Sequence, residues 1–153
     1  MIKGSCLCGA VTFEAEHVVG PFELCHCSRC RKVSGGAFMP AIGVAVKGYR
    51  MLSGQQDVQQ FQLPVREHPP GYLTMFCRNC GSPVPPPQPD GDWFEIPAGI
   101  LDTDPGIRPD KHIYVDYRAP WVEIAEGLPR YTKDEIRTLR SATNPIKDDE
   151  EEP

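Results

Sequence analysis

Two pairs of cysteines constrain this 153-residue sequence most, because they lie far apart along the chain. Cys6 and Cys8 form a C-x-C pair, and Cys77 and Cys80 form a C-x-x-C pair followed by glycine. A C-x-x-C turn directs both sulfurs to one side, and residues two apart in an extended segment share a face. We call these residues the four-cysteine group, and they predict a closed, structural zinc site. The alternative is four buried thiols that act as small apolar side chains.

The other three cysteines are packed into the stretch CHCSRC. Cys25, Cys27 and Cys30, here called the three-cysteine group, can converge on one ion and leave its fourth position to water or substrate. That arrangement distinguishes catalytic zinc from structural zinc. His26 is a rival fourth ligand, but between two ligands in an extended segment its side chain should point away and make hydrogen bonds instead. The predicted cofactor content is therefore two zinc ions per chain.

Basic residues lie in and directly after the three-cysteine group, at Arg29, Arg31 and Lys32. Three thiolates on one divalent ion leave a net negative charge, which nearby cations moderate. These side chains are candidates to hydrogen-bond the sulfurs or to receive an anionic substrate group. The alternative is that they are solvated charges on a loop.

Other titratable residues give weaker signals. Asp102, Asp104 and His112 are conceivable proton carriers, but we expect turn and surface roles for them. His17, His68 and His112 have no ligand spacing to one another and are interpreted as ordinary polar residues.

Proline and glycine, with 17 and 14 copies, interrupt the chain so often that long helices are not expected. The alternation in VTFEAE (11–16) predicts a strand. Further strands are predicted from β-branched and aromatic content at 36–46, 58–63, 72–77, 92–101, 112–117 and 121–124. The predicted fold class is mainly β, with small antiparallel sheets packed together.

The run PVPPPQPDGD (83–92) is predicted to be a loop, because proline lacks the N–H that helices and central strands need. A ligand for a proline-recognition domain is the alternative. Near the end, Thr132 and Glu135 fit a capping box, and Ile136 and Leu139 form one apolar edge of a short helix. The expected division of the chain is a zinc domain, a short helix and a disordered acidic tail: 1–131, 132–144 and 145–153.

Charge and hydropathy narrow the possible partners. With 21 acidic and 16 basic side chains the net charge is -5, which argues against a nucleic-acid backbone or an anionic membrane surface. No apolar run approaches the about 20 residues of a bilayer span, and MIKGSCLCG is too short and polar for a signal peptide. We therefore expect a cytoplasmic protein. In that reducing compartment, an odd count of seven cysteines favours metal or thiol chemistry over disulfides.

The three cysteine motifs, in this order, resemble those of the glutathione-dependent formaldehyde-activating enzyme family, also called the CENP-V/GFA domain family. GSCLCGAVTFE resembles its opening motif, CHCSRCRKVSGGAF its central motif and FCRNCGSPV its third, and AGILDTDPGIRPDKHIYVDYRAPWVEI is similar to its later pattern. The resemblance covers residues 3–125 and implies an Mss4-like fold of small β-sheets around zinc. It implies that the four-cysteine group holds structural zinc and the three-cysteine group holds catalytic zinc.

The activity that the resemblance implies joins glutathione to formaldehyde to give S-(hydroxymethyl)glutathione, and is classed with carbon–sulfur lyases. A thiol bound to zinc loses its proton at neutral pH and becomes a nucleophile, which suits the three-cysteine group. The expected partner is glutathione or a related thiol adduct, and the sequence sets no oligomeric state. Two other function classes stay open: a non-enzymatic zinc module that binds a protein, and a thiol redox sensor or zinc store.

Overall fold

The structure is a computed structural model that describes residues 1–64 and 71–143. Its strands are β1 (Ile2–Ser5), β2 (Thr12–Ala15), β3 (Val18–Cys25), β4 (Met39–Ala45), β5 (Tyr49–Ser53), β6 (Val58–Gln62), β7 (Leu73–Cys77), β8 (Trp93–Pro97), β9 (Lys111–Ile113) and β10 (Arg130–Tyr131). Its helices are α1 (Ser28–Ser34) and α2 (Lys133–Thr143), with single 3₁₀ turns η1 (Gln55–Asp57), η2 (Ala98–Ile100) and η3 (Val115–Tyr117). The prediction of a mainly β fold with one short C-terminal helix is confirmed.

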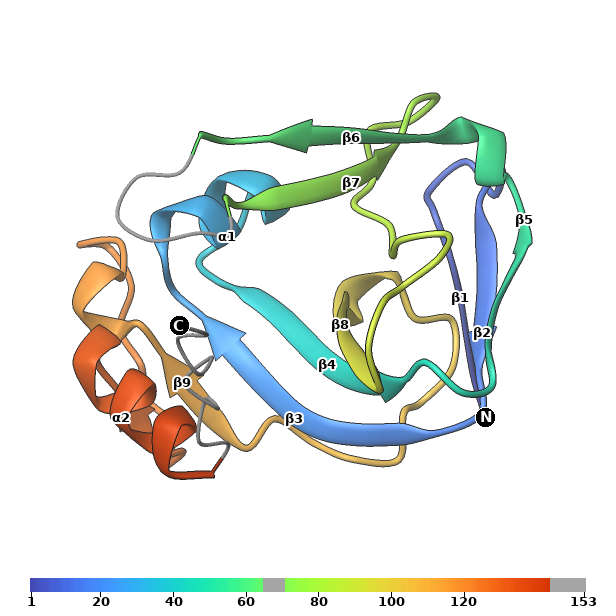
Figure 1. The fold of residues 1–153 in the computed structure, drawn as a ribbon. Coiled ribbons are helices and arrows are strands. Elements are labelled where there is room, and N and C mark those ends of the chain that lie inside the picture. Colours follow the sequence, from blue (N-terminus) through green and yellow to red (C-terminus); the bar gives the residue numbers. More distant parts are fainter. Residues whose placement is uncertain (65–70, 144–153) are drawn as a thin grey trace, which may run out of the picture.

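The described strands form three sheets, with the orders β1-β2-β5, β10-β9-β3-β4-β8 and β6-β7. All neighbours are antiparallel except at β9, which runs parallel to both β3 and β10. The five-stranded sheet is therefore mixed, where the sequence predicted only antiparallel sheets. Figure 1 shows the β6-β7 pair along one side of the molecule, with α1 below its end and α2 beside β9.

The main core lies between the three-stranded and five-stranded sheets. It is built from inward-facing side chains of β1, β2, β3, β4 and β8: Ile2, Phe13, Ala15, Phe22, Ile42, Val44 and Ile96. Burying these apolar side chains supplies most of the stability of the fold. The core also fixes the path of β3, whose last residue is the first cysteine of the three-cysteine group.

The predicted strands 11–16, 36–46, 58–63, 72–77 and 92–101 are confirmed with shorter limits. The strand at 112–117 is only half right, because the chain leaves β9 at Tyr114, whose φ of 56° cannot continue a strand. The strand at 121–124 is wrong, since this segment is irregular in the structure. The Arg130 guanidinium donates to the carbonyl oxygen of Ile124 at the end of this segment (2.7 Å) and to that of Glu126 just after it (3.1 Å).

The C-terminal helix begins as predicted, with Thr132 and Glu135 capping each other. The Glu135 carboxylate accepts from the Thr132 N–H at 2.8 Å, and the Glu135 N–H donates to the Thr132 hydroxyl at 3.4 Å. Ile136 is buried, whereas Leu139 is 37% exposed. The predicted tail, 145–153, lies outside the described residues. In the described ranges, no helix is long and apolar enough to cross a bilayer.

Candidate metal centres and active site

The structure brings the four-cysteine group together at the junction of two sheets. Cys6 follows β1, and Cys77 ends β7. The four sulfurs lie within 4.8 Å of one another, with Cys6 and Cys8 at 3.5 Å and Cys8 and Cys77 at 3.8 Å. The Val11 N–H donates to the Cys6 sulfur at 3.3 Å, as expected where a thiolate needs neutralising. Four converging sulfurs fit the closed tetrahedral donor set of a structural zinc ion.

A tight turn after β7 sets the direction of the later pair. The Gly81 N–H donates to the Cys77 carbonyl at 2.8 Å, and Gly81 has a φ of 75°, which favours glycine. The Ser82 hydroxyl hydrogen-bonds the Cys80 sulfur at 3.4 Å and lowers the pKa of that thiol to about 6. It also accepts from the Leu7 N–H at 3.1 Å, which ties the turn to the first pair. The chain itself therefore positions both pairs.

The three-cysteine group lies where β3 gives way to α1. Cys25 ends β3, Cys27 caps α1, and Cys30 lies in its first turn, with the three sulfurs within 4.8 Å. The Cys27 sulfur accepts from the Cys30 N–H at 3.4 Å. Hydrogen bonds from the Cys25 thiol, and then from the Cys30 thiol, lower the pKa of Cys27 to about 2. Contact with Cys27 raises the pKa of Cys25, and contact with Cys25 and then Cys27 raises that of Cys30, so a bound cation would stabilise the thiolate forms of these crowded sulfurs.

The His26 side chain lies away from the thiols, in a buried chain of hydrogen bonds. Its Nε2 lies 2.8 Å from Nδ1 of His112, and Nε2 of His112 lies 2.5 Å from the Glu126 carboxylate. Both imidazoles are at most 1% exposed, so the expected surface role of His112 is wrong. Desolvation lowers the pKa of His26 to about 4, and its Nδ1 has no partner among the described residues. The Phe38 ring packs against both imidazoles.

The three predicted basic residues have different surroundings. Arg29 lies in the wall of a cavity beside the three-cysteine group, and its guanidinium stands 5.6 Å from the centre of the Tyr72 ring. The Arg31 Nε donates to the His26 carbonyl at 3.2 Å, which holds the backbone between Cys25 and Cys27, while Lys32 is exposed. Arg31 and Lys32 do not line this cavity in the described part of the chain.

The acidic candidates and the remaining histidines also lie away from the thiols. Asp104 closes a turn by accepting from the Gly106 N–H at 2.8 Å, and its ion pair with Arg108 lowers its pKa to about 2. Asp102 is exposed, and its N–H donates to the carbonyl of Lys3. His17 is a surface residue near Glu16, and His68 lies outside the described residues.

A cavity of about 380 Å³ opens beside the three-cysteine group. All three cysteines line it, and its other walls combine tyrosines, cations and acids: Tyr72, Tyr114, Tyr117, Arg29, Lys133, Arg137, Arg140, Glu23 and Glu95. We call it the thiol cavity. Burial raises the pKa values of Tyr72 and Tyr114. The cavity thus offers hydroxyls that stay protonated beside the thiols.

Helix α2 supplies a basic wall of this cavity that the sequence prediction missed. Lys133, Arg137 and Arg140 are spaced four and three residues apart, so they share one face of the helix. That spacing was a readable signal, although nothing in the sequence indicated which cavity the face would meet. Figure 1 shows α2 beside β9, on the side of the molecule where β3 ends.

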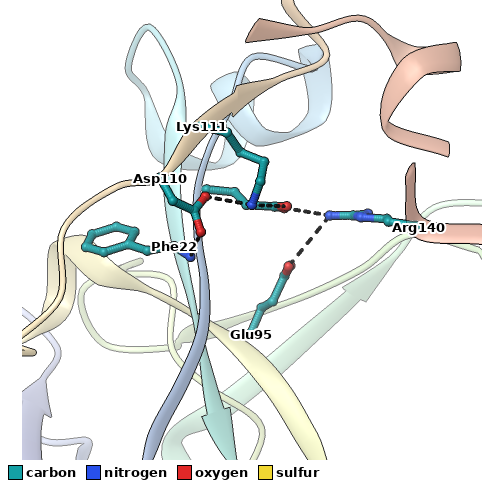
Figure 2. A network of polar contacts seen from close by, with 6 residues as sticks. Phe22, Glu95, Asp110, Lys111 and Arg140 are labelled. Atoms are coloured by element: carbon teal, nitrogen blue, oxygen red, sulfur yellow. Dashed lines mark hydrogen bonds and ion pairs between the residues drawn. The ribbon is translucent and has the colours of Figure 1, made fainter. Parts of the chain in front are cut away.

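A buried carboxylate connects α2 to the five-stranded sheet. Glu23 on β3 is 3% exposed, and its carboxylate lies 2.5 Å from Nη2 of Arg140 and 3.5 Å from Nζ of Lys111. Figure 2 shows the Arg140 guanidinium pointing at the Glu95 carboxylate, which is 3.9 Å away. Asp110 accepts from Lys111 on the other side of the network, at 2.6 Å. These ion pairs hold the basic wall against the sheet.

The segment that matches a known protein family contains the same cysteines. The model of the family described as glutathione-dependent formaldehyde-activating enzyme matches residues 1–117, which include all seven cysteines. The chain belongs to this family. A protein of Halomonas elongata named "Putative glutathione-dependent formaldehyde-activating enzyme" is 33% identical over 141 residues, an alignment that covers 81% of each chain. The family prediction made from the cysteine motifs is confirmed.

A solved structure supports the fold. The crystal structure of a Rhodobacter sphaeroides protein is 24% identical and has a TM-score of 0.51, covering 85% of this chain and 99% of that chain. This likeness shows the fold alone. The glutathione-dependent formaldehyde-activating enzyme match ends at Tyr117, before α2 begins at Lys133. The basic wall on α2 therefore lies beyond the segment that the family model matches.

Proposed function

We propose that this protein is a zinc-dependent carbon–sulfur lyase that forms or cleaves S-(hydroxymethyl)glutathione or a related thiol adduct. One observation carries the proposal: the three-cysteine group lines a cavity, whereas the four-cysteine group is complete in itself. Membership of the glutathione-dependent formaldehyde-activating enzyme family supports the choice of glutathione and formaldehyde.

The donor sets of both groups fit zinc, because soft thiolates in sets of four and three are typical zinc ligands. The four-cysteine group would hold a structural ion and the three-cysteine group a catalytic one. Zinc bound at the three-cysteine group would supply acidity, lowering the pKa of a coordinated thiol.

The walls of the thiol cavity suit the charges of glutathione, which carries two carboxylates and one ammonium group. Arg29 and Lys133 can donate to the carboxylates, and Glu95 can accept from the ammonium. Partial burial, and then the charge of Glu23, raises the pKa of Glu95. Arg140 is ion-paired with Glu23, so we expect it to hold this end of the cavity wall in place and not to bind glutathione by itself. Glutathione bound in this way would place its sulfur near the three-cysteine group.

The bond changes need one proton donor. In the forming direction the thiolate sulfur bonds to the aldehyde carbon, and the carbonyl oxygen takes a proton. In the cleaving direction the deprotonated donor takes that proton back, the carbonyl double bond re-forms, and the C–S bond breaks with its electron pair returning to sulfur. Tyr72 and Tyr114 line the cavity, and a tyrosine hydroxyl is neutral at physiological pH, so each can donate a hydrogen bond or a proton to the oxygen.

The test compares the zinc-loaded wild type with a Cys27→Ser variant. Exchange between free and adducted glutathione in the presence of formaldehyde can be followed by nuclear magnetic resonance. The wild type should accelerate the exchange and Cys27→Ser should lose the acceleration, with the circular dichroism spectrum unchanged. Exchange at the uncatalysed rate with both proteins would overturn the proposed function.

A further inference from the structure

A second cavity, of about 390 Å³, adjoins the thiol cavity. It lies between β7, β8 and the proline-rich segment 83–92, and four prolines of that segment line it. Most of its other walls are apolar side chains from α1 and the two strands: Val33, Leu73, Met75, Phe94 and Ile96. We call it the apolar cavity. The proline-rich segment is thus a loop, as predicted, and it also forms the wall of a pocket.

The two cavities share four wall residues, Met39, Ala41, Tyr72 and Glu95. Met39 is the β4 partner of Cys25 across the antiparallel pair, and it packs against the buried cluster that contains Cys25 and Cys30. Ala41 lies two residues further along β4, on the same face. The two cavities therefore meet beside the three-cysteine group, where Met39 and Ala41 supply apolar wall and Tyr72 and Glu95 supply polar groups.

We propose that the apolar cavity holds the carbon group of the thiol adduct, and that this group is larger than the single carbon of formaldehyde. The inference rests on the proposed function, whose substrate class it narrows. A hydroxymethyl group needs no room beyond the thiol cavity, whereas the apolar cavity is as large again. A few polar groups beside a larger apolar pocket are typical of a site for an amphipathic small molecule.

The substrate class is therefore an adduct of glutathione, or of a similarly charged thiol, with an alkyl or aryl aldehyde. The reaction is unchanged: sulfur bonds to the aldehyde carbon and the oxygen gains a proton, or the reverse. The polar and basic walls hold the charged thiol, and the apolar walls take the alkyl or aryl part of the aldehyde out of water. Chain length should then be recognised through apolar burial.

Binding of S-methyl-, S-butyl- and S-hexylglutathione to the zinc-loaded protein tests this without needing turnover. Isothermal titration calorimetry should show the Kd falling about fourfold for each added methylene, which is the effect of removing one methylene from water. A Kd that is flat or rises with chain length would overturn the inference. So would a failure of all three compounds to bind.

Two leucine variants provide the matched comparison. Leu73 lines the apolar cavity and is 44% exposed, whereas Leu52 on β5 is 53% exposed and lines neither cavity. Leu73→Gln should weaken binding of S-hexylglutathione by about threefold or more and leave S-methylglutathione unchanged. Leu52→Gln should change neither. Equal effects of the two variants would overturn the inference.

Turnover measurements distinguish a failure of the apolar binding site from a failure of the proposed lyase function. Measured rates with formaldehyde, butanal and hexanal should rise with chain length. Turnover of formaldehyde alongside a flat binding series would leave the lyase proposal standing and overturn the apolar substrate. Binding that tightens with chain length, with no turnover of any aldehyde adduct, would support the apolar cavity as a binding site and overturn the lyase.

Discussion

Ile136 anchors helix α2, so its truncation should release the basic wall of the thiol cavity. Its side chain is 1% exposed and packs with Cys25, Cys30 and Ile113. The change Ile136→Ala removes three carbon atoms, each worth about 0.8 kcal/mol when buried. The cavity left behind adds to this, giving a loss of about 3 kcal/mol in the free energy of unfolding.

The assay is urea denaturation at a fixed free zinc concentration, together with hydrogen exchange of the α2 amides. Ile136→Ala should lower the midpoint and speed exchange throughout α2. The control is Leu139→Ala on the same helix, which should cost less than about 1 kcal/mol because Leu139 is 37% exposed. Equal losses from the two variants, or unchanged exchange in α2, would refute this account of how the helix is held.

Two further predictions concern charge. Arg29→Ala should raise KM for glutathione about three- to tenfold, because it removes a cation from the wall of the thiol cavity. Lys32→Ala should leave KM unchanged, since Lys32 lies outside that wall. Equal KM values for the two variants would contradict the assignment of Arg29 to the glutathione-binding wall. Glu23→Gln should cost about 2 kcal/mol in urea denaturation, because a buried carboxylate with two cationic partners is lost. The exposed ion pair removed by Asp104→Asn should cost less than about 1 kcal/mol, and a larger loss there than at Glu23 would reverse the expected order.

The cysteine groups could be predicted because their geometry is local. A C-x-C pair next to a strand and a C-x-x-C turn followed by glycine each fix the direction of two sulfurs, and the strand that ends at Cys77 was readable from YLTMFC. Once each pair was directed, convergence needed only one tertiary contact. The same locality explains the capping box of α2, whose partners, Thr132 and Glu135, are three residues apart.

Elements held by distant contacts were not predictable. Strand β3 was missed because Gly20 and Pro21 interrupt its pattern, yet the sheet on both sides retains it. Helix α1 has seven residues, too few for a period to show, and its capping residue is Cys27 rather than the usual serine or aspartate. β10 has only two residues.

The sequence predicted that His26 points away from the thiols and makes hydrogen bonds, but the partners of the buried polar groups were missed because they come from far along the chain. His26 meets His112 across 86 residues, and Glu23 meets Arg140 across 117 residues. A lone histidine or arginine in a sequence does not specify such a partner. Only the spacing of the basic residues on α2 was informative: it indicated that they share one helix face, but not which part of the protein that face contacts.

Whether the three-cysteine group holds zinc can be measured as the zinc content per chain of protein purified anaerobically without added metal. It would be measured for the wild type and for a variant in which Cys25, Cys27 and Cys30 are all serine. We expect two zinc ions in the wild type and one in a variant that keeps its circular dichroism spectrum. One ion in both proteins would contradict it, because the three-cysteine group would then hold no metal.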